Sequence, residues 1–528
     1  MILDARNIPD EQVLETDVCI IGAGAAGITL AREFRDKRFR VVLLESGGLE
    51  PDAETQALYQ GEIIGHPYYP LDGSRNRFFG GTTASWGGMC LPFDSIDFKA
   101  RDWVPHSGWP FELQQLEPYY RRAHEPCQLG PFEYRESYWT PRRGKESLPI
   151  DGELILPQIA QFSPPTRFGQ AYREDIQRAK SVTAYLYANV LEMEADELGR
   201  TVQTVRVGTL DGGRFSVSAK HFILAAHAIE NARLLLLSRS VMADGLGNQH
   251  GLVGRFFMER VNCRSGVFVP VNGDAIAPFF ENDRLAECGI NGFLGTSGDW
   301  QRENRVLNSS IHLHAAPLRL RDVQKGNGSA SGDGETTRRS EASDGDLAAH
   351  AWEVIKGLSD DAKAAWQRLW HREESDQIVF DIWQDVEPVP NPNSRVMLSR
   401  ELDSLGQPKV MLDWQLTPSL EGTTIRSALK LFAAEMGRLG LGRVRMDISE
   451  HGDAWAEDVV GSFHHIGTTR MHPDERKGVV DENCRVHGLS NLYVAGSSVF
   501  PTAGQANPTL TLIALALRLG DRITRQFS

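Results

Sequence analysis

The chain has 528 residues, more than one hydrophobic core usually supports, so we expect two domains or one elaborated domain. Hydrophobic residues make up 41% of it and charged residues 24%, a composition typical of globular proteins and unlike that of disordered or fibrous ones. The formal net charge of -14 disfavours nucleic acid and anionic membrane surfaces as partners, because both bind clustered lysine and arginine. A neutral or cationic small molecule suits this charge better.

The six cysteines are spread along the chain, without the close pairs of a zinc site, and they are too sparse for a disulfide scaffold. We therefore expect free, buried thiols and no metal. Residues 1–16 lack a basic segment leading into an apolar one, and no later stretch offers the roughly 18 uninterrupted apolar residues of a membrane span. These patterns predict a cytoplasmic protein without a membrane span.

Residues 17–45 have the pattern of a strand, a glycine turn, a helix, a second strand and an acid. The residues expected to hold a dinucleotide are Gly22, Gly24, Gly27 and Glu45. The first glycine allows a tight turn, the second lets the backbone approach a pyrophosphate, and the third lets helix and strand pack closely. The acid accepts hydrogen bonds from ribose hydroxyls and disfavours the 2′-phosphate of NADP. The alternative is a purely structural turn.

A second glycine-rich loop occupies residues 75–89. It lies too far along the chain from the first turn for us to expect that it serves the same phosphates, and a second loop suits a ligand longer than NAD. The alternative is a surface loop, although such loops seldom place an aromatic residue between two glycine pairs, as Trp86 is placed here.

The pattern of residues 183–226 predicts a series of strands. Residues 183–194 alternate as one strand, 202–210 and 214–219 form a hairpin, and 222–226 form a further apolar strand. From residue 256 longer alternating segments predict the sheet of a second domain. The expected division is a cofactor domain of residues 1–255 and 451–528 and a substrate-binding domain of residues 256–450.

A polar stretch interrupts the second domain at residues 325–346, which contain no large apolar side chain. Such a stretch buries too little surface to order itself, so it is either a disordered insertion or a lid that orders over bound substrate. A hairpin around residues 403–406 and an amphipathic helix at 420–437 complete this domain.

The C-terminal residues concentrate the chemistry. Phe463 to Met471 contain two adjacent histidines, and histidine suits the removal of a hydroxyl proton because its unperturbed pKa lies near neutrality. Residues 494–498 read as the last buried strand, and Asn507-Pro508-Thr509 opens the final helix, where proline in the first turn is favourable. A zinc site built from the histidines of this region lacks the required spacing and cysteine partners.

Together with the turn at residues 22–27, this end resembles the glucose-methanol-choline (GMC) flavoprotein oxidoreductases. The resemblance implies an α/β fold: a Rossmann-type FAD-binding domain of the GMC fold, with an α+β substrate-binding domain built on an antiparallel sheet. It also implies oxidation of an alcohol to a carbonyl by hydride transfer to flavin N5, with O2 or a quinone or dye as electron acceptor. The run Ala506 to Thr511 looks most like that of the sugar-oxidising branch, which contains pyranose oxidases and glycoside 3-oxidases or dehydrogenases.

The resemblance assigns roles residue by residue. His464 is expected to be the catalytic base, with Asn507 holding the substrate oxygen by its amide N–H groups, and His465, Gln384 and Glu387 are expected to bind substrate. For the two strand residues Gln384 and Glu387, the alternative is that they face solvent. The further FAD contacts it implies are Gly80, Gly81, Ser85, Gly87, Gly88, Met89, Val190, Gly496, Ser497, Asn507, Pro508 and Thr509.

Two positions depart from the family pattern. Ser85 stands where some relatives carry a histidine bonded covalently to the flavin, so we expect noncovalent FAD. His227 stands where we expect glycine, in a strand-to-helix turn near the dinucleotide, and is expected to be structural rather than catalytic. The function expected is oxidation of a ring hydroxyl of a sugar or glycoside. The alternatives are an aliphatic or aryl alcohol as substrate, or a flavin-binding protein without turnover.

Overall fold

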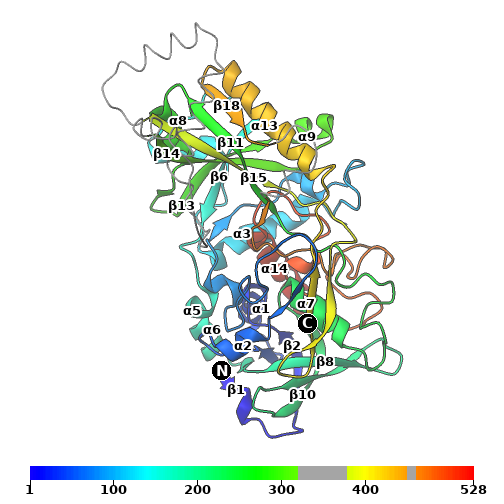
Figure 1. Ribbon diagram of the computed structural model, residues 1–528. Coiled ribbons are helices and arrows are strands. Elements are labelled where there is room, and N and C mark those ends of the chain that lie inside the picture. The colour runs from blue at the N-terminus through cyan, green and yellow to red at the C-terminus, as the bar shows by residue number, and fades with distance from the viewer. Residues whose placement is uncertain (319–376, 449–458, 528) are drawn as a thin grey trace, which may run out of the picture.

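This computed structural model describes residues 1–318, 377–448 and 459–527. The polar stretch at 325–346, expected to be an insertion or a lid, lies outside the described residues. Within them, two large sheets lie at opposite ends of the view in Figure 1, with helices α3 (Leu113–Cys127) and α14 (Pro508–Gln526) between.

The first sheet is the dinucleotide-type sheet that the sequence predicts. Its strands run in the order β1-β7-β3-β2-β10-β9-β8, with β20 beside β10; the pairs from β1 to β10 and the pair with β20 are parallel. The bounds are β1 (Ile2–Asp4), β2 (Val13–Ile21), β3 (Val41–Leu44), β7 (Val182–Leu186), β8 (Asn189–Ala195), β9 (Val202–Gly208), β10 (Arg214–Leu224) and β20 (Leu492–Val494). Helices α1 (Ala25–Phe34) and α14 pack against one another, and their buried faces supply much of the core.

Local details of this sheet differ from the prediction. The single strand expected at 183–194 is divided into β7 and β8, because Tyr187 takes a positive φ of 60° and turns the chain. The two strands expected at 214–219 and 222–226 are instead one strand, β10, which pairs along its length with β2 and at its start with β9. The hairpin of β9 and β10 is confirmed.

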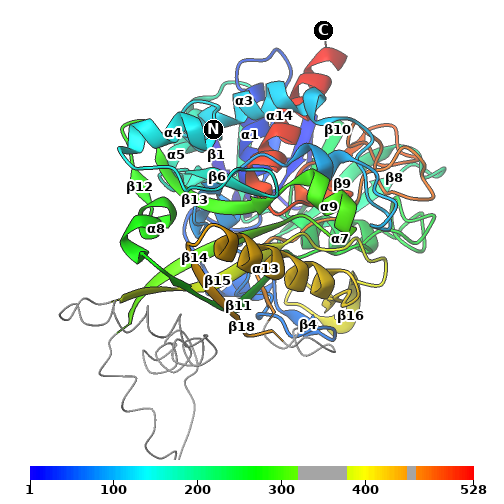
Figure 2. The same cartoon turned by 90° about the horizontal axis from the view of Figure 1, so that it is seen from above.

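The second sheet is antiparallel throughout, in the order β18-β11-β15-β14-β13-β6-β5, with β12 and β19 at its side. Its strands are β5 (Met89–Cys90), β6 (Ile155–Phe162), β11 (Val261–Pro270), β12 (Asp283–Arg284), β13 (Gly289–Thr296), β14 (Ser309–Leu318), β15 (Gln377–Val386), β18 (Gly442–Met446) and β19 (Val460–Gly461). Helix α13 (Glu421–Arg438) lies across it in Figure 2, and α8 (Gly273–Phe280) packs against β11, β13, β14 and β15.

Sheet membership does not follow the expected domain boundaries. The antiparallel sheet draws β5 and β6 from residues 1–255 and β19 from residues 451–528, although all three ranges were assigned to the cofactor domain. A third, small sheet pairs the hairpin of β16 (Arg395–Leu402) and β17 (Pro408–Asp413) with β4 (Gly61–Ile63), again joining the two assignments. Alternation shows that a segment is a strand, but strand pairing is decided by contacts distant in sequence.

The described part of the chain contains no helix that is long and apolar enough to cross a bilayer. All six cysteines are buried and none of them forms a disulfide bond, as predicted.

Candidate active site

The first glycine turn joins β2 to α1. Gly22 has a φ of 104°, which glycine adopts without strain, and a Cβ atom on Gly27 would lie 1.9 Å from the carbonyl oxygen of Gly22. A Cβ atom on Gly24 would meet no protein atom within 4 Å, so open space lies beside this residue. The three glycines thus have the distinct environments that the prediction required: turn, open approach and close packing.

Glu45 follows β3, and its carboxylate hydrogen-bonds the backbone of the glycine turn. Its Oε2 accepts the N–H of Ala23 at 2.8 Å, and its Oε1 accepts the N–H of Gly47 at 2.9 Å. The carboxylate keeps further lone pairs for a ligand, because each oxygen has capacity for more than one hydrogen bond.

The second glycine loop meets the first, contrary to the expectation that the two are far apart. The N–H of Gly80 donates to the carbonyl of Ala23 at 2.8 Å, and a Cβ atom on Gly81 would lie 3.1 Å from the Cα of Gly24. The expectation was wrong because it rested on distance along the chain, whereas the fold brings the loop into contact with the turn. The Oγ of Ser85 accepts the side-chain N–H of Asn76 at 2.8 Å.

One cavity of about 480 Å³ joins these loops to the C-terminal motifs. Predicted residues in its lining are Gly22, Gly24, Glu45, Gly81, Ser85, Gly87, Gly88, Val190, His464, His465, Gly496, Ser497, Asn507, Pro508 and Thr509. Predicted residues outside the lining are Gly27, Gly80, Met89, Gln384 and Glu387. Gly27 packs against the carbonyl of Gly22, and a Cβ atom on Gly80 would lie 2.6 Å from the backbone nitrogen of Gly169. The carbonyl of Met89 accepts the side-chain N–H of Asn507 at 3.3 Å.

Gln384 and Glu387 do not reach this cavity, so the expectation that they bind substrate is corrected. Both are fully buried. The carboxylate of Glu387 forms an ion pair with Arg101 and accepts the N–H of Asn308 at 3.1 Å, and Gln384 donates to the carbonyl of Ile425 at 3.2 Å. Strand alternation could not decide this, because both faces of β15 are covered.

His464 lies in the cavity wall with an unengaged ring. Within the described residues, its Nδ1 atom is buried without a hydrogen-bond partner. Burial, and then the nearby charge of Arg260, lowers the pKa of His464 well below its ordinary value, although Asp385 opposes this. The ring is therefore neutral near pH 7, as a proton acceptor must be.

Asn507 is the residue before α14, and its amide is oriented by Arg260, a residue whose role was not predicted from the sequence. Nη1 of Arg260 donates to Oδ1 of Asn507 at 2.7 Å and forms an ion pair with Asp385 at 3.1 Å. The oxygen of the amide is thus occupied, and its NH2 group faces away from Arg260. The available signal was a pair of adjacent charges, Glu259 and Arg260, directly before an apolar strand.

His465 is engaged at both ring nitrogens. Its Nδ1 lies 3.1 Å from Nε2 of His227, and its Nε2 lies 2.7 Å from the hydroxyl of Tyr68. His227 begins helix α7 (Ala228–Leu237) with a φ of 84° and a ψ of 155°, a conformation almost confined to glycine, and its ring lines the cavity. The departure from glycine that the sequence revealed thus marks a strained residue in contact with the site.

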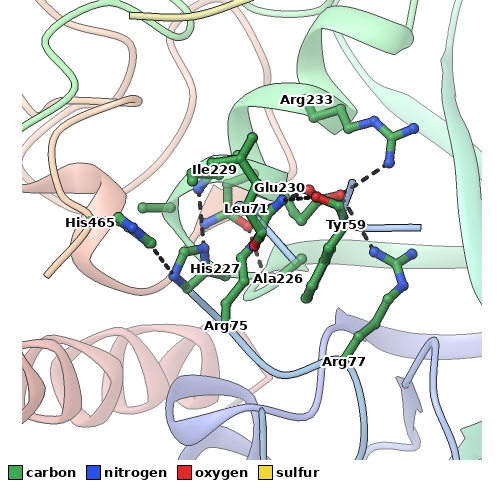
Figure 3. A network of polar contacts seen from close by, with 12 residues as sticks. Tyr59, Leu71, Arg75, Arg77, Ala226, His227, Ile229, Glu230, Arg233 and His465 are labelled. Atoms are coloured by element: carbon green, nitrogen blue, oxygen red, sulfur yellow. Dashed lines mark hydrogen bonds and ion pairs between the residues drawn. The ribbon is translucent and has the colours of Figure 1, made fainter. Parts of the chain in front are cut away.

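Three arginines surround one buried carboxylate beside the same cavity (Figure 3). Glu230 lies 3.0 Å from Arg75, 3.6 Å from Arg77 and 3.4 Å from Arg233, and Arg233 also pairs with Asp403 at 2.6 Å. Burial alone would raise the pKa of Glu230, but the arginines, Arg75 first, outweigh it and lower this pKa. This cluster was not predicted from the sequence. Its signal was the pair of arginines at 75 and 77 flanking an asparagine in a glycine-rich loop.

Among the residues that the structure describes, no three His, Cys, Asp or Glu side chains are grouped so as to hold a metal ion.

Two segments of the chain match known protein families. Residues 390–516 match the family model described as GMC oxidoreductase, and residues 17–250 match that described as FAD dependent oxidoreductase. The chain is 25% identical to the fructose dehydrogenase large subunit of Gluconobacter japonicus, over 97% of this chain and 98% of that one. It is also 25% identical to paromamine 6'-oxidase of Streptomyces fradiae, over 96% and 92%.

A solved structure supports the same fold. Formate oxidase, at 16% identity, superposes with a TM-score of 0.56 and covers 98% of this chain and 99% of its own. The matched segments contain the glycine turn and the His464 and Asn507 motifs described above. The chain therefore combines a GMC oxidoreductase segment, residues 390–516, with an FAD-dependent oxidoreductase segment, residues 17–250.

Proposed function

We propose that this protein oxidises an alcohol with His464 as the acceptor of the hydroxyl proton and Asn507 as the donor that holds the oxygen. One observation carries the proposal: both residues line the cavity that also contains the two glycine loops and the start of α14. A proton acceptor and a hydrogen-bond donor therefore face the space in which a cofactor and an alcohol would meet.

The residues present fit FAD. Added Cβ atoms on Gly24, Gly87 or Gly496 would meet no protein atom within 4 Å, so the backbone is open to a ligand at three points around the cavity. The two loops would hold the pyrophosphate, Glu45 the ribose, and residues 507–509 the flavin end. When bound, FAD supplies the acceptor for the hydride that leaves the carbinol carbon.

His464 is a better candidate for the base than His465. Both nitrogens of His465 are engaged, by His227 and by Tyr68, whereas the ring of His464 has no hydrogen-bond partner within the described residues. Asn507 presents its NH2 group because Arg260 occupies its oxygen, and one N–H donates to Met89, which leaves the other for the substrate oxygen.

The substrate we propose is a neutral sugar or glycoside oxidised at a ring hydroxyl, giving a keto-sugar. Its support is the net charge of -14 and the relatives, which include C-glycoside 3-oxidase of Microbacterium trichothecenolyticum, 24% identical over 84% of this chain. A non-sugar alcohol is the second candidate, because 2-methyl-1,2-propanediol dehydrogenase of Mycolicibacterium austroafricanum is 23% identical over 97% of this chain.

Anaerobic bleaching of the flavin across sugars, glycosides and simple alcohols tests the proposal. We expect a sugar or glycoside to bleach fastest. If hexanol or benzyl alcohol is faster than every sugar, the second candidate replaces the first, and no bleaching by any alcohol would leave a flavin-binding protein without turnover. Reoxidation by O2 or by a quinone dye identifies the acceptor.

Noncovalent attachment of FAD is a separate part of the proposal. Ser85 offers a hydroxyl where a histidyl bond to the flavin would need an imidazole. We expect acid precipitation to release all the yellow colour into the supernatant. Colour that stays in the washed pellet contradicts the role given to Ser85.

A further inference from the structure

Four side chains connect the start of α7 to the segment that carries His464. His227, which caps α7, meets His465 at 3.1 Å, and His465 meets the hydroxyl of Tyr68 at 2.7 Å. Tyr68 then donates to Oε2 of Glu259 at 2.6 Å. The side chains of His465 and Glu259 are fully buried. Figure 3 shows the first part of this series, from Ile229 through His227 to His465.

The other oxygen of Glu259 holds the backbone next to the proposed base. Its Oε1 accepts the N–H of His464 at 2.8 Å and the N–H of Ser462 at 3.0 Å. Between these two amides lies Phe463, with a φ of 60° that residues other than glycine rarely adopt. One carboxylate thus secures a strained turn, and His464 is presented by that turn.

The hydrogen bonds run in one direction only. The N–H of Ile229 donates to Nδ1 of His227 at 3.3 Å, so this nitrogen carries no proton. Burial, and then Arg75, lowers the pKa of His227 to about 3, so the ring is neutral and its single proton lies on Nε2. His227 therefore donates to His465. Burial, followed by His227 and Arg75, also lowers the pKa of His465, which is neutral and donates from Nε2 to Tyr68.

The opposite direction is excluded by the first contact. It would place a proton on Nδ1 of His227, directly against the N–H of Ile229. Because each group in the series has one proton to donate, the start of α7 decides the tautomer of both histidines. It also makes Glu259, in its ionised carboxylate form, the final acceptor of the series, with both oxygens receiving donors.

We propose that His227, His465, Tyr68 and Glu259 form a positioning chain of fixed hydrogen-bond direction that holds the turn carrying His464. This inference rests on the proposed role of His464. It gives His227 a role that explains its strained backbone: a glycine would relieve the strain but would lose the donor to His465. His227 is therefore a positioning residue, and stability and rate should respond to its removal in opposite directions.

The test replaces His227 in two ways. His227→Gly should leave FAD content unchanged and the melting temperature equal or higher, while flavin reduction slows about tenfold, the kinetic equivalent of one lost hydrogen bond. His227→Gln keeps an N–H group near the position of Nε2 and should restore the rate to within about threefold of wild type. Unchanged reduction in His227→Gly overturns the proposal, and so does a lower melting temperature with no rescue by glutamine.

A matched control separates strain from the chain. His106 is exposed, has a φ of 61° and lies outside the cavity lining, so His106→Gly makes the same substitution at another positive φ. We expect it to leave flavin reduction unchanged. A tenfold slowing there, equal to that of His227→Gly, would show that the loss is not specific to the chain.

Two measurements complete the test. The variant Tyr68→Phe cuts the same chain further along, so adding His227→Gly to it should cost no further rate, whereas independent costs would multiply and overturn the proposal. Nitrogen NMR of labelled histidines should show His465 protonated at Nε2 in the wild-type protein; protonation at Nδ1 overturns the direction. This readout needs no substrate. A wild-type protein that no alcohol reduces would defeat the proposed function while the tautomer still tests the chain.

Discussion

The two walls of the cavity are built in different ways. The first, formed by the turn at residues 22–27 and Glu45, uses backbone amides and the absence of side chains, and its residues are close in sequence. The second, which presents His464 and Asn507, depends on side chains from distant segments: Arg260 orients the amide, and Glu259 secures the turn. The turn and the acid of the first wall thus come from one local motif, whereas the groups of the second wall are oriented by tertiary contacts.

The largest effect should come from adding a side-chain atom at the closely packed glycine of the first wall. In Gly27→Ala the new Cβ atom would lie 1.9 Å from the carbonyl of Gly22, so helix and strand must separate. We expect a loss of about 3 kcal/mol of unfolding free energy in the FAD-free protein, at the upper end for overpacking, together with weaker FAD binding.

Its matched control is Gly24→Ala. That Cβ atom meets open space, so the stability of the FAD-free protein should not change while FAD affinity falls. Thermal melting and FAD titration measure both variants. Equal destabilisation by the two would mean that the wall is not divided into a packing glycine and an approach glycine.

Removing the proposed base should affect the chemistry of the second wall without affecting FAD binding by the first. His464→Ala should keep FAD content and melting temperature near those of wild type, yet slow flavin reduction by about 100-fold or more, the usual scale for a positioned proton acceptor. Stopped-flow reduction by the best alcohol measures it. Near wild-type reduction would transfer the proton chemistry to another group, despite the engagement of His465 by two partners.

The second wall should also make stability depend on pH. Burial raises the pKa of Glu259 from 4.5 to about 7, although Tyr68, two backbone amides and Arg260 oppose the shift. Because the folded state binds the proton more tightly than the unfolded state, this group lowers the stability as pH rises from 4.5 to about 7.

Glu259→Gln should remove this pH-dependent loss of stability, flattening the profile over this window by about 3 kcal/mol. Urea unfolding at pH 4.5 and pH 7 measures it, with the variant's change subtracted from that of wild type. An unaltered slope would show that Glu259 titrates alike in the folded and unfolded states.

The smallest effect should come from Asn507. Its side chain makes no capping hydrogen bond to α14, so Asn507→Ala should leave the melting temperature almost unchanged while slowing reduction about tenfold through the loss of one donor. Asn507→Asp provides the comparison, since it keeps the shape and replaces the donor by an oxygen. If the aspartate variant is faster than the alanine variant, the amide does not act as a donor to the substrate oxygen.

The sequence by itself predicted the family, the cofactor cradle and the two residues proposed for the chemistry. It could do so because these are local motifs. A strand that leads into Gly22 predicts the glycine turn, and a proline in the first turn predicts the start of α14, each from a few neighbouring residues. The same locality explains why the departure at His227 was visible as a histidine where a glycine was expected.

Only the tertiary structure decided which strands share a sheet and which side chains face the cavity. Residues 155–162 form β6, and nothing local in the sequence shows that they join the antiparallel sheet. Gln384 and Glu387 are polar residues at the end of a strand, yet Arg101 and the carbonyl of Ile425 engage them away from the cavity. Tyr68, His227 and His465 are up to 397 residues apart, and their hydrogen-bond direction exists only after folding brings them together.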